Sequence, residues 1–180
     1  MSQTSLDFLW SPTPPWIYLG LGEADRTAWT PSHFYSLDEV KVCTRRLRGW
    51  KMRSRASLMS EFGAALQFFE DFGENWYALE ECLCYLDEWL PAEAYVIVIE
   101  RAEELLVDDD DEGLRALLAT LQAVGEFWSQ PINEPDRFVR GAVPFHALLN
   151  VSPDQTGAVR RIEEAAASLS VGLRTDGAPT

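Results

Sequence analysis

Apolar residues follow two different spacings along this chain, one typical of β-strands and one typical of α-helices. Residues 40–47 roughly alternate between apolar and charged side chains, which predicts a strand. Residues 95–99 form a continuous apolar run bounded by charges, which predicts a strand buried on both faces, as in a parallel sheet. Residues 143–151 predict another strand, and residues 16–19 predict a short one after a proline-rich stretch.

Between these strands, apolar residues three and four positions apart predict helices over residues 57–69, 75–89 and 114–128. Asn75 is the expected N-cap of the second helix, because its side-chain oxygen can accept a hydrogen bond from the first turn. Pro91 ends that helix. Ser152-Pro153 predicts the start of a shorter helix that runs to about Leu169.

The predicted order is strand, helix, helix, strand, helix, strand. Helical crossovers between strands indicate an α/β domain with a parallel sheet flanked by helices, which we expect to cover residues 39–151. Residues 1–38 are rich in proline and aromatic rings, so we expect this N-terminal extension to pack on the domain. We expect residues 152–171 to form a C-terminal helix and residues 172–180 to form a disordered tail.

The charge of the chain is strongly negative and unevenly distributed. The formal net charge is −14, a value that repels nucleic acid and anionic membranes and attracts basic partners. Residues 41–55 contain seven basic residues and no acidic one, whereas residues 70–112 contain sixteen acidic residues and Arg101 as the single basic one. Single charges usually lie on solvated faces, but this segregation predicts one strongly negative side. The short basic stretch is a weak indication of nucleic-acid binding.

Several other classes of protein are disfavoured by the sequence. The N-terminus has no basic region before an apolar run, and no apolar run is long enough to span a membrane. The three cysteines make an odd count, which is typical of reduced thiols and a cytoplasmic protein. Cys82 and Cys84 would point about 200° apart on a helix, and the acidic run at 108–112 lacks the spacing of a calcium loop. We therefore expect no metal and no cofactor.

One twelve-residue stretch joins the first two predicted helices and carries the most specific pattern, Phe72-Gly73-Glu74-Asn75-Trp76-Tyr77-Ala78-Leu79-Glu80-Glu81-Cys82-Leu83. It resembles the signature of the barstar family, in which an aromatic-Gly-x-Asn-(Trp/Leu)-Asp-Ala-Leu-x-Asp-Cys-Leu run joins those helices. The element order agrees over residues 40–151. The resemblance implies a three-stranded parallel sheet flanked by helices and a protein that inhibits a basic ribonuclease without being an enzyme.

Inhibitors of this family cover the basic catalytic cleft of a ribonuclease with the loop before the second helix and with the exposed face of that helix. The resemblance therefore implies that carboxylates here occupy the positions of RNA phosphates. We expect the partner-binding residues to be Asp71, Glu74, Asn75, Trp76, Tyr77, Glu80 and Glu81. The expected partner is a basic ribonuclease or a ribonuclease-like toxin, without direct contact to nucleic acid or membrane, and the free chain is expected to be monomeric.

The chain departs from the family pattern at both motif aspartates. Tyr77 replaces the first, which removes a charge and adds a ring suited to a protein interface. Glu81 replaces the second and reaches one methylene further. We infer a partner related to the usual target but not identical to it. Part of the motif also has a structural explanation, because Gly73 fits a turn and Ala78, Leu79, Cys82 and Leu83 fit a core-facing stripe.

Two alternatives remain open at this point. The same fold could serve as an interaction or regulatory module without ribonuclease inhibition, and the Tyr77 substitution keeps that alternative open. A hydrolase that uses the acidic cluster is the minor alternative, because nothing in the sequence indicates a carboxyl group with a raised pKa or a substrate pocket.

Overall fold

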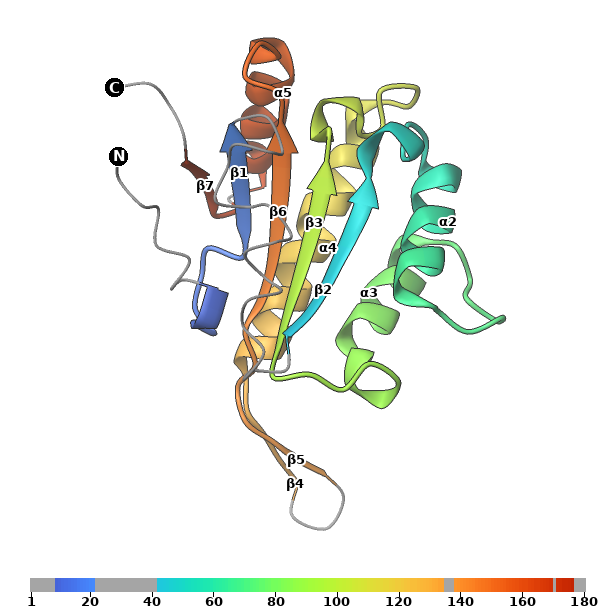
Figure 1. The fold of residues 1–180 in the computed structure, drawn as a ribbon, viewed down its shortest axis with the longest axis vertical. Helices are drawn as coiled ribbons and strands as arrows, with labels where there is room; N and C mark the ends of the chain where they lie inside the picture. The colour runs from blue at the N-terminus through green and yellow to red at the C-terminus, as the bar shows by residue number, and fades with distance from the viewer. Residues whose placement is uncertain (1–8, 22–41, 135–137, 170, 177–180) are drawn as a thin grey trace.

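The computed structural model describes residues 9–21, 42–134, 138–169 and 171–176. Its centre is a five-stranded sheet in the order β2-β3-β6-β1-β7, and every pair of neighbouring strands is parallel. Figure 1 shows this sheet with its helices. The strands are β1 (Ile17–Leu21), β2 (Val42–Arg48), β3 (Ala94–Glu100), β6 (Phe145–Val151) and β7 (Leu173–Asp176).

The helices share one core with one face of the sheet. In β3, Tyr95, Ile97 and Ile99 belong to this core, while Val96 and Val98 belong to a smaller cluster with Leu9 on the other face. β3 is thus buried on both faces, as its continuous apolar run predicted. The helices are α2 (Arg55–Leu66), α3 (Trp76–Cys84), α4 (Asp111–Ser129) and α5 (Thr156–Ser168), with short 3-10 turns at Gly49–Lys51, Leu86–Glu88 (η3) and Ala102–Glu104.

The α/β class and the helix-flanked parallel sheet are confirmed, but the expectation of three strands is wrong. β2, β3 and β6 are the three expected strands, and β1 and β7 extend the sheet beyond β6. β1 confirms the short strand predicted at residues 16–19, but it is part of the central sheet, whereas the N-terminal extension was expected to pack on the domain. Leu173–Asp176, expected in a disordered tail, form β7 and pair with β1. Residues 177–180 lie outside the described residues, as do residues 1–8 and 22–41 of the N-terminal extension.

A second departure is an antiparallel hairpin between α4 and β6, where the sequence pattern predicted no strand. β4 (Ile132–Glu134) pairs with β5 (Phe138–Arg140), and the hairpin projects from the end of the molecule where α4 ends (Figure 1). Arg140 fixes its base, because the guanidinium lies 4.2 Å from the ring centroid of Trp128 and 5.2 Å from that of Phe127.

Part of the basic stretch at residues 41–55 is paired with carboxylates within the fold. Arg46 pairs with Glu100, Arg48 with Glu61, and Arg53 with both Glu104 and Asp108. These pairs tie β2 and the start of α2 to β3 and to the acidic segment that follows it. Three of the seven basic side chains of residues 41–55 are therefore used in structural contacts.

The Arg48–Glu61 pair should make stability depend on pH. The buried Glu61 carboxylate accepts hydrogen bonds from Arg48 N, Nε and Nη2 at 3.0, 2.8 and 2.8 Å. The Arg48 guanidinium lowers the pKa of Glu61 below its ordinary value of 4.5. The resulting stabilisation is therefore complete above pH 4.5 and is lost as the pH falls through the lowered pKa.

We expect Glu61→Gln to lower the free energy of unfolding by about 2 kcal/mol at neutral pH. The difference in unfolding free energy between wild type and variant should become smaller when urea unfolding is repeated below about pH 4. Glu164→Gln is the control, because Glu164 forms an exposed pair with Arg160 on α5. A difference in unfolding free energy between wild type and Glu61→Gln that stays constant with pH would contradict the assignment of this pH dependence to the Arg48–Glu61 pair.

Candidate functional site

The loop between α2 and α3 is held in one conformation by hydrogen bonds. Asn75 caps α3 by accepting a hydrogen bond at 3.0 Å from Ala78 N, and its amide donates to Gly73 O at 2.9 Å. The predicted N-cap is confirmed. The left-handed residue of the turn is Glu74, with φ of 47°, rather than Gly73. A Cβ at Gly73 would lie 3.0 Å from Asn75 Nδ2, so a larger residue there would crowd the capping side chain.

We expect Asn75→Ala to destabilise the protein by about 1 kcal/mol, because one amide of the first turn of α3 loses its acceptor. Asn75→Ser keeps a capping oxygen and should retain most of the stability. Urea unfolding of both variants checks this prediction. Equal destabilisation by alanine and serine would mean that the contact of the amide with Gly73 matters more than the cap.

α3 itself is fixed to the core by its inner side. Leu79 and Leu83 are buried, and Trp128 Nε1 on α4 donates to Leu83 O at 2.9 Å. The helix ends at Cys84, five residues earlier than the expected end at residue 89, and η3 (Leu86–Glu88) turns the chain back toward α2. Trp89 Nε1 donates to Leu66 O at 2.9 Å and so attaches this turn to the last turn of α2.

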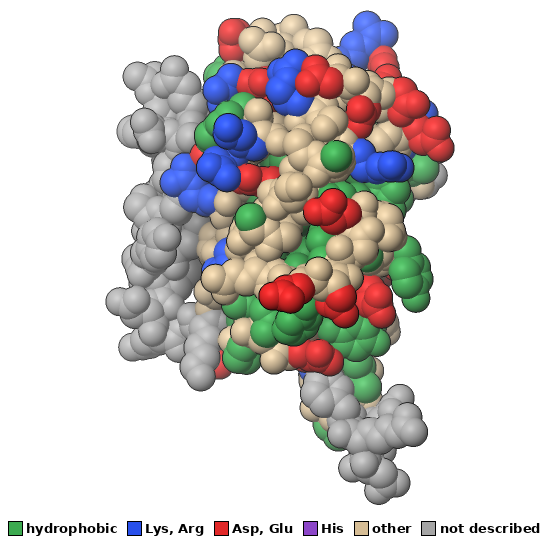
Figure 2. All heavy atoms as spheres, turned by 90° about the vertical axis from the view of Figure 1, so that its right-hand side faces the viewer, with side chains coloured by type: hydrophobic (Ala, Val, Ile, Leu, Met, Phe, Trp, Pro, Cys, Tyr) green, Lys and Arg blue, Asp and Glu red, His purple; other side chains and the backbone are tan. Residues whose placement is uncertain are grey.

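The outer side of α3 carries the most exposed part of the expected site. Tyr77 is 77% exposed, and Glu80 and Glu81 beside it are exposed as well. We call the exposed carboxylates around α3, together with Tyr77, the acidic face; its carboxylates are Asp71, Glu74, Glu80, Glu81 and Glu88. Figure 2 views the side of the molecule that carries α2 and α3. Carboxylates lie among hydrophobic side chains in its lower half, and basic side chains gather in its upper half.

None of these five carboxylates forms an ion pair among the residues that the structure describes. The field of the acidic face is therefore directed at solvent and at whatever binds there.

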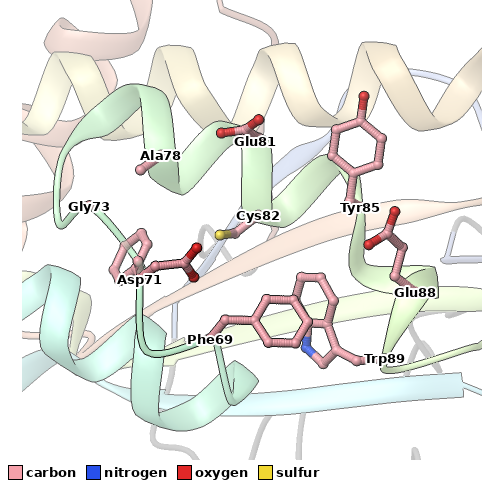
Figure 3. A pocket seen from close by; sticks show the side chains of 10 residues that line it. Phe69, Asp71, Gly73, Ala78, Glu81, Cys82, Tyr85, Glu88 and Trp89 are labelled. Atoms are coloured by element: carbon pink, nitrogen blue, oxygen red, sulfur yellow. The ribbon is translucent and has the colours of Figure 1, made fainter.

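A cleft opens beside α3, with a volume of about 420 Å³. We call it the aromatic cleft, since Phe69, Tyr85 and Trp89 line it together with three carboxylates of the acidic face, Asp71, Glu81 and Glu88. Figure 3 shows Asp71, Glu81 and Glu88 around its margin and the Phe69 and Trp89 rings next to each other. The Cys82 thiol also lines it, and its pKa is raised by burial and by the nearby Glu81 and Asp71 carboxylates.

The seven residues expected at the site do not all lie together. Asp71 and Glu81 line the aromatic cleft, and Tyr77 and Glu80 lie on the exposed side of α3. Glu74 lines a shallower depression over α2. Asn75 acts as a cap, and the half-buried Trp76 lines a different depression with Asp109 and Asp110 near the start of α4. Tyr77 and Glu81 are thus both available to a partner.

Sequence reasoning missed Phe69, Tyr85, Glu88 and Trp89 as site residues. Three of them fell in or beside a helix that was expected to continue to residue 89. Among the residues that the structure describes, no group of three or more His, Cys, Asp or Glu side chains is placed to hold a metal ion. In the same part of the chain, no helix is long and apolar enough to cross a membrane.

Comparison with known families identifies one that fits this arrangement. The model of the family described as "Barstar (barnase inhibitor)" matches residues 42–148, more than half of the chain. The chain belongs to the barstar family. The matched region contains β2, β3, most of β6 and helices α2 to α4. The acidic face and the aromatic cleft lie within this barstar region, whereas β1, α5 and β7 lie outside it.

Comparison with curated protein sequences finds no significant match. Among solved structures, the ADP form of the ORC2 protein of Aeropyrum pernix is similar with a TM-score of 0.55 and 13% identity. The ADPNP-ADP complexes of the same protein give a TM-score of 0.54 and 13% identity. Each match covers 88% of this chain and 41% of the ORC2 chain. At this identity the likeness concerns the fold alone, and it covers a larger share of the chain than the barstar region does.

Proposed function

We propose that this chain is a non-enzymatic inhibitor that binds and occludes the basic active site of a ribonuclease or a ribonuclease-like toxin. Its membership of a family described as barnase inhibitors supports this proposal. The observation that carries it is the acidic face, where exposed Tyr77 and unpaired carboxylates lie on and around a helix fixed to the core.

In this proposal, inhibition requires no covalent step. A ribonuclease active site presents cationic side chains to the phosphates of RNA, and carboxylates such as Glu80 and Glu81 take the place of those phosphates. Tyr77 supplies a large ring that buries apolar area at low conformational cost. Because α3 is held by its buried residues and by Trp128, little of the binding energy is lost in ordering the helix.

We expect association with the ribonuclease to be fast and sensitive to salt. Raising the ionic strength from about 0.01 M to about 1 M shortens the Debye length from about 30 Å to about 3 Å. The association rate should fall by at least about tenfold over this range, while the dissociation rate changes much less. Stopped-flow fluorescence measures both rates. An association rate that is independent of salt would contradict electrostatic steering by the acidic face.

The first test is to capture partners at low salt from a lysate of the source cells and from their medium, and to assay each captured protein for ribonuclease activity. An equimolar complex in which the ribonuclease activity of the captured protein is inhibited supports the proposal. We expect the inhibitor to act in the cytoplasm and to be monomeric when free, which size-exclusion chromatography of the free chain and of the complex can test.

A second candidate is an interaction or regulatory module on the same fold, and the tyrosine at position 77, where the family pattern has aspartate, favours it. A stable complex with a purified basic ribonuclease whose activity is unaffected would support this candidate and contradict inhibition.

A further inference from the structure

The aromatic cleft combines features that suit one kind of side chain. The Phe69 and Trp89 rings meet edge to face with centroids 4.9 Å apart, and Tyr85 is 48% exposed at the same cleft. The indole of Trp89 is fixed by its hydrogen bond to Leu66 O at the end of α2. The Trp89 ring is therefore held in place before any partner arrives, and the Phe69 ring packs against it.

The charge of the cleft is negative on several sides. Asp71 comes from the loop before α3, Glu81 from α3 itself and Glu88 from η3, and Figure 3 shows the three carboxylates around the cleft. Among the described residues, no basic side chain pairs with any of them. The raised pKa of Cys82, which reflects burial together with the Glu81 and Asp71 carboxylates, agrees with a negative potential inside the cleft.

The protein itself shows which cation such surroundings accept. At the base of the β4–β5 hairpin, the Arg140 guanidinium lies over the Trp128 ring and hydrogen-bonds backbone carbonyls of Phe127, Trp128 and Gln130 at 3.4 Å. Arg101 likewise lies over Trp50, 5.4 Å from the ring centroid. In both contacts a guanidinium lies over an aromatic ring and donates to oxygen atoms, which are backbone carbonyls for Arg140 and the Glu104 carboxylate for Arg101. The aromatic cleft likewise combines aromatic rings with carboxylate oxygens.

We propose that the aromatic cleft receives the guanidinium group of an arginine from the basic protein partner. This inference rests on the proposed function and adds a contact built largely from residues outside the twelve-residue motif, namely Phe69, Tyr85, Glu88 and Trp89. A guanidinium is planar and weakly hydrated, so it stacks on rings while its N–H groups reach carboxylates on several sides. A lysine ammonium is compact and strongly hydrated, and it gains less from the same rings.

The test uses small probes and needs no identified partner. N-acetyl-arginine amide is titrated into the isotope-labelled full chain, and the NMR shifts of the Trp89 indole N–H and the Tyr85 ring are followed. We expect saturable shifts confined to the cleft, with a dissociation constant on the order of millimolar. N-acetyl-lysine amide should bind several-fold more weakly. N-acetyl-citrulline amide, a neutral analogue of similar shape, should cause no saturable shift.

Two substitutions of exposed residues separate charge from ring contacts. Glu88→Gln should weaken arginine binding by about threefold, and Tyr85→Ala by about threefold as well. Asp154→Asn, on the loop between β6 and α5, removes one exposed negative charge remote from the cleft and should leave binding unchanged. The spectra of the variants away from the substitution report whether the fold is retained.

Equal shifts with arginine and citrulline, or shifts that map away from Trp89 and Tyr85, would overturn the proposal. If the chain inhibits a ribonuclease while the arginine probe leaves the cleft unshifted, the cleft inference fails and the proposed function stands. If the arginine probe binds the cleft but no ribonuclease is inhibited, the cleft is supported as an arginine site and the proposed function fails.

Discussion

Replacing Tyr77 by alanine is expected to weaken the complex with a cognate ribonuclease by roughly 2 kcal/mol or more, about thirtyfold in the dissociation constant. Tyr77 is the most exposed of the large hydrophobic residues that the structure describes. It lies on a fixed helix beside carboxylates, the surroundings in which aromatic side chains act as interface hot spots. Glu81→Gln should have an effect of similar size, because the cationic group opposite it would lose its charged partner.

Neither change should affect the stability of the free chain, because both side chains are exposed. Isothermal titration calorimetry with the ribonuclease and thermal unfolding of the free variants measure the two effects separately. Leu169→Ala and Asp154→Asn are the controls, since they alter an exposed apolar residue after α5 and an exposed carboxylate on the loop between β6 and α5. If Tyr77→Ala and Glu81→Gln bound as tightly as these controls, the acidic face would not be the binding surface.

A large loss of stability is expected from Gly125→Ala, because Gly125 is where α4 meets the segment before β1. A Cβ at Gly125 would lie 2.3 Å from Cγ and 2.7 Å from Cβ of Trp16, a fully buried residue just before β1. The indole cannot move without displacing its neighbours, so we expect a loss of about 3 kcal/mol. Trp16→Ala alone should cost about 3–5 kcal/mol through the cavity that it leaves.

Combining the two substitutions tests the contact directly. In the Trp16→Ala background the clash is absent, so Gly125→Ala should cost little or even stabilise α4 through the higher helix propensity of alanine. Gly113→Ala in the same helix is the control, since its Cβ would meet the Leu106 side chain at an ordinary 3.6 Å. Urea unfolding of the four proteins gives the coupling energy. Additive losses would mean that Trp16 and Gly125 act independently.

The sequence predicted those elements whose own pattern determines their structure. β3 was predicted from its continuous apolar run, and the strand is buried on both faces. α4 was predicted because its apolar residues keep a helical spacing as far as Trp128. β7 could not be predicted in this way. Its four residues, Leu-Arg-Thr-Asp, show no alternation strong enough to indicate a strand, and they are extended because β1 lies beside them.

The candidate site was predicted only where it follows the linear motif. Tyr77 and Glu81 were expected on one exposed helical face, and both are exposed on α3. The cleft depends instead on the end of α3 at Cys84, after which η3 brings Trp89 against Phe69. The helical spacing of apolar residues continues through Leu86 and Leu90, so the sequence did not indicate that α3 ends at Cys84. The contact joins residues from two elements, which a helical pattern cannot indicate.

The position of β1 has a consequence for how the chain folds during synthesis. Ile17 is translated well before its partners in the sheet, Ala147 and Leu173. Until then β1 has no neighbouring strand, and a large loop must close before it gains one. The apolar β1 segment therefore has no sheet partner until β6 has been translated, a period in which chaperone binding would protect it from aggregation.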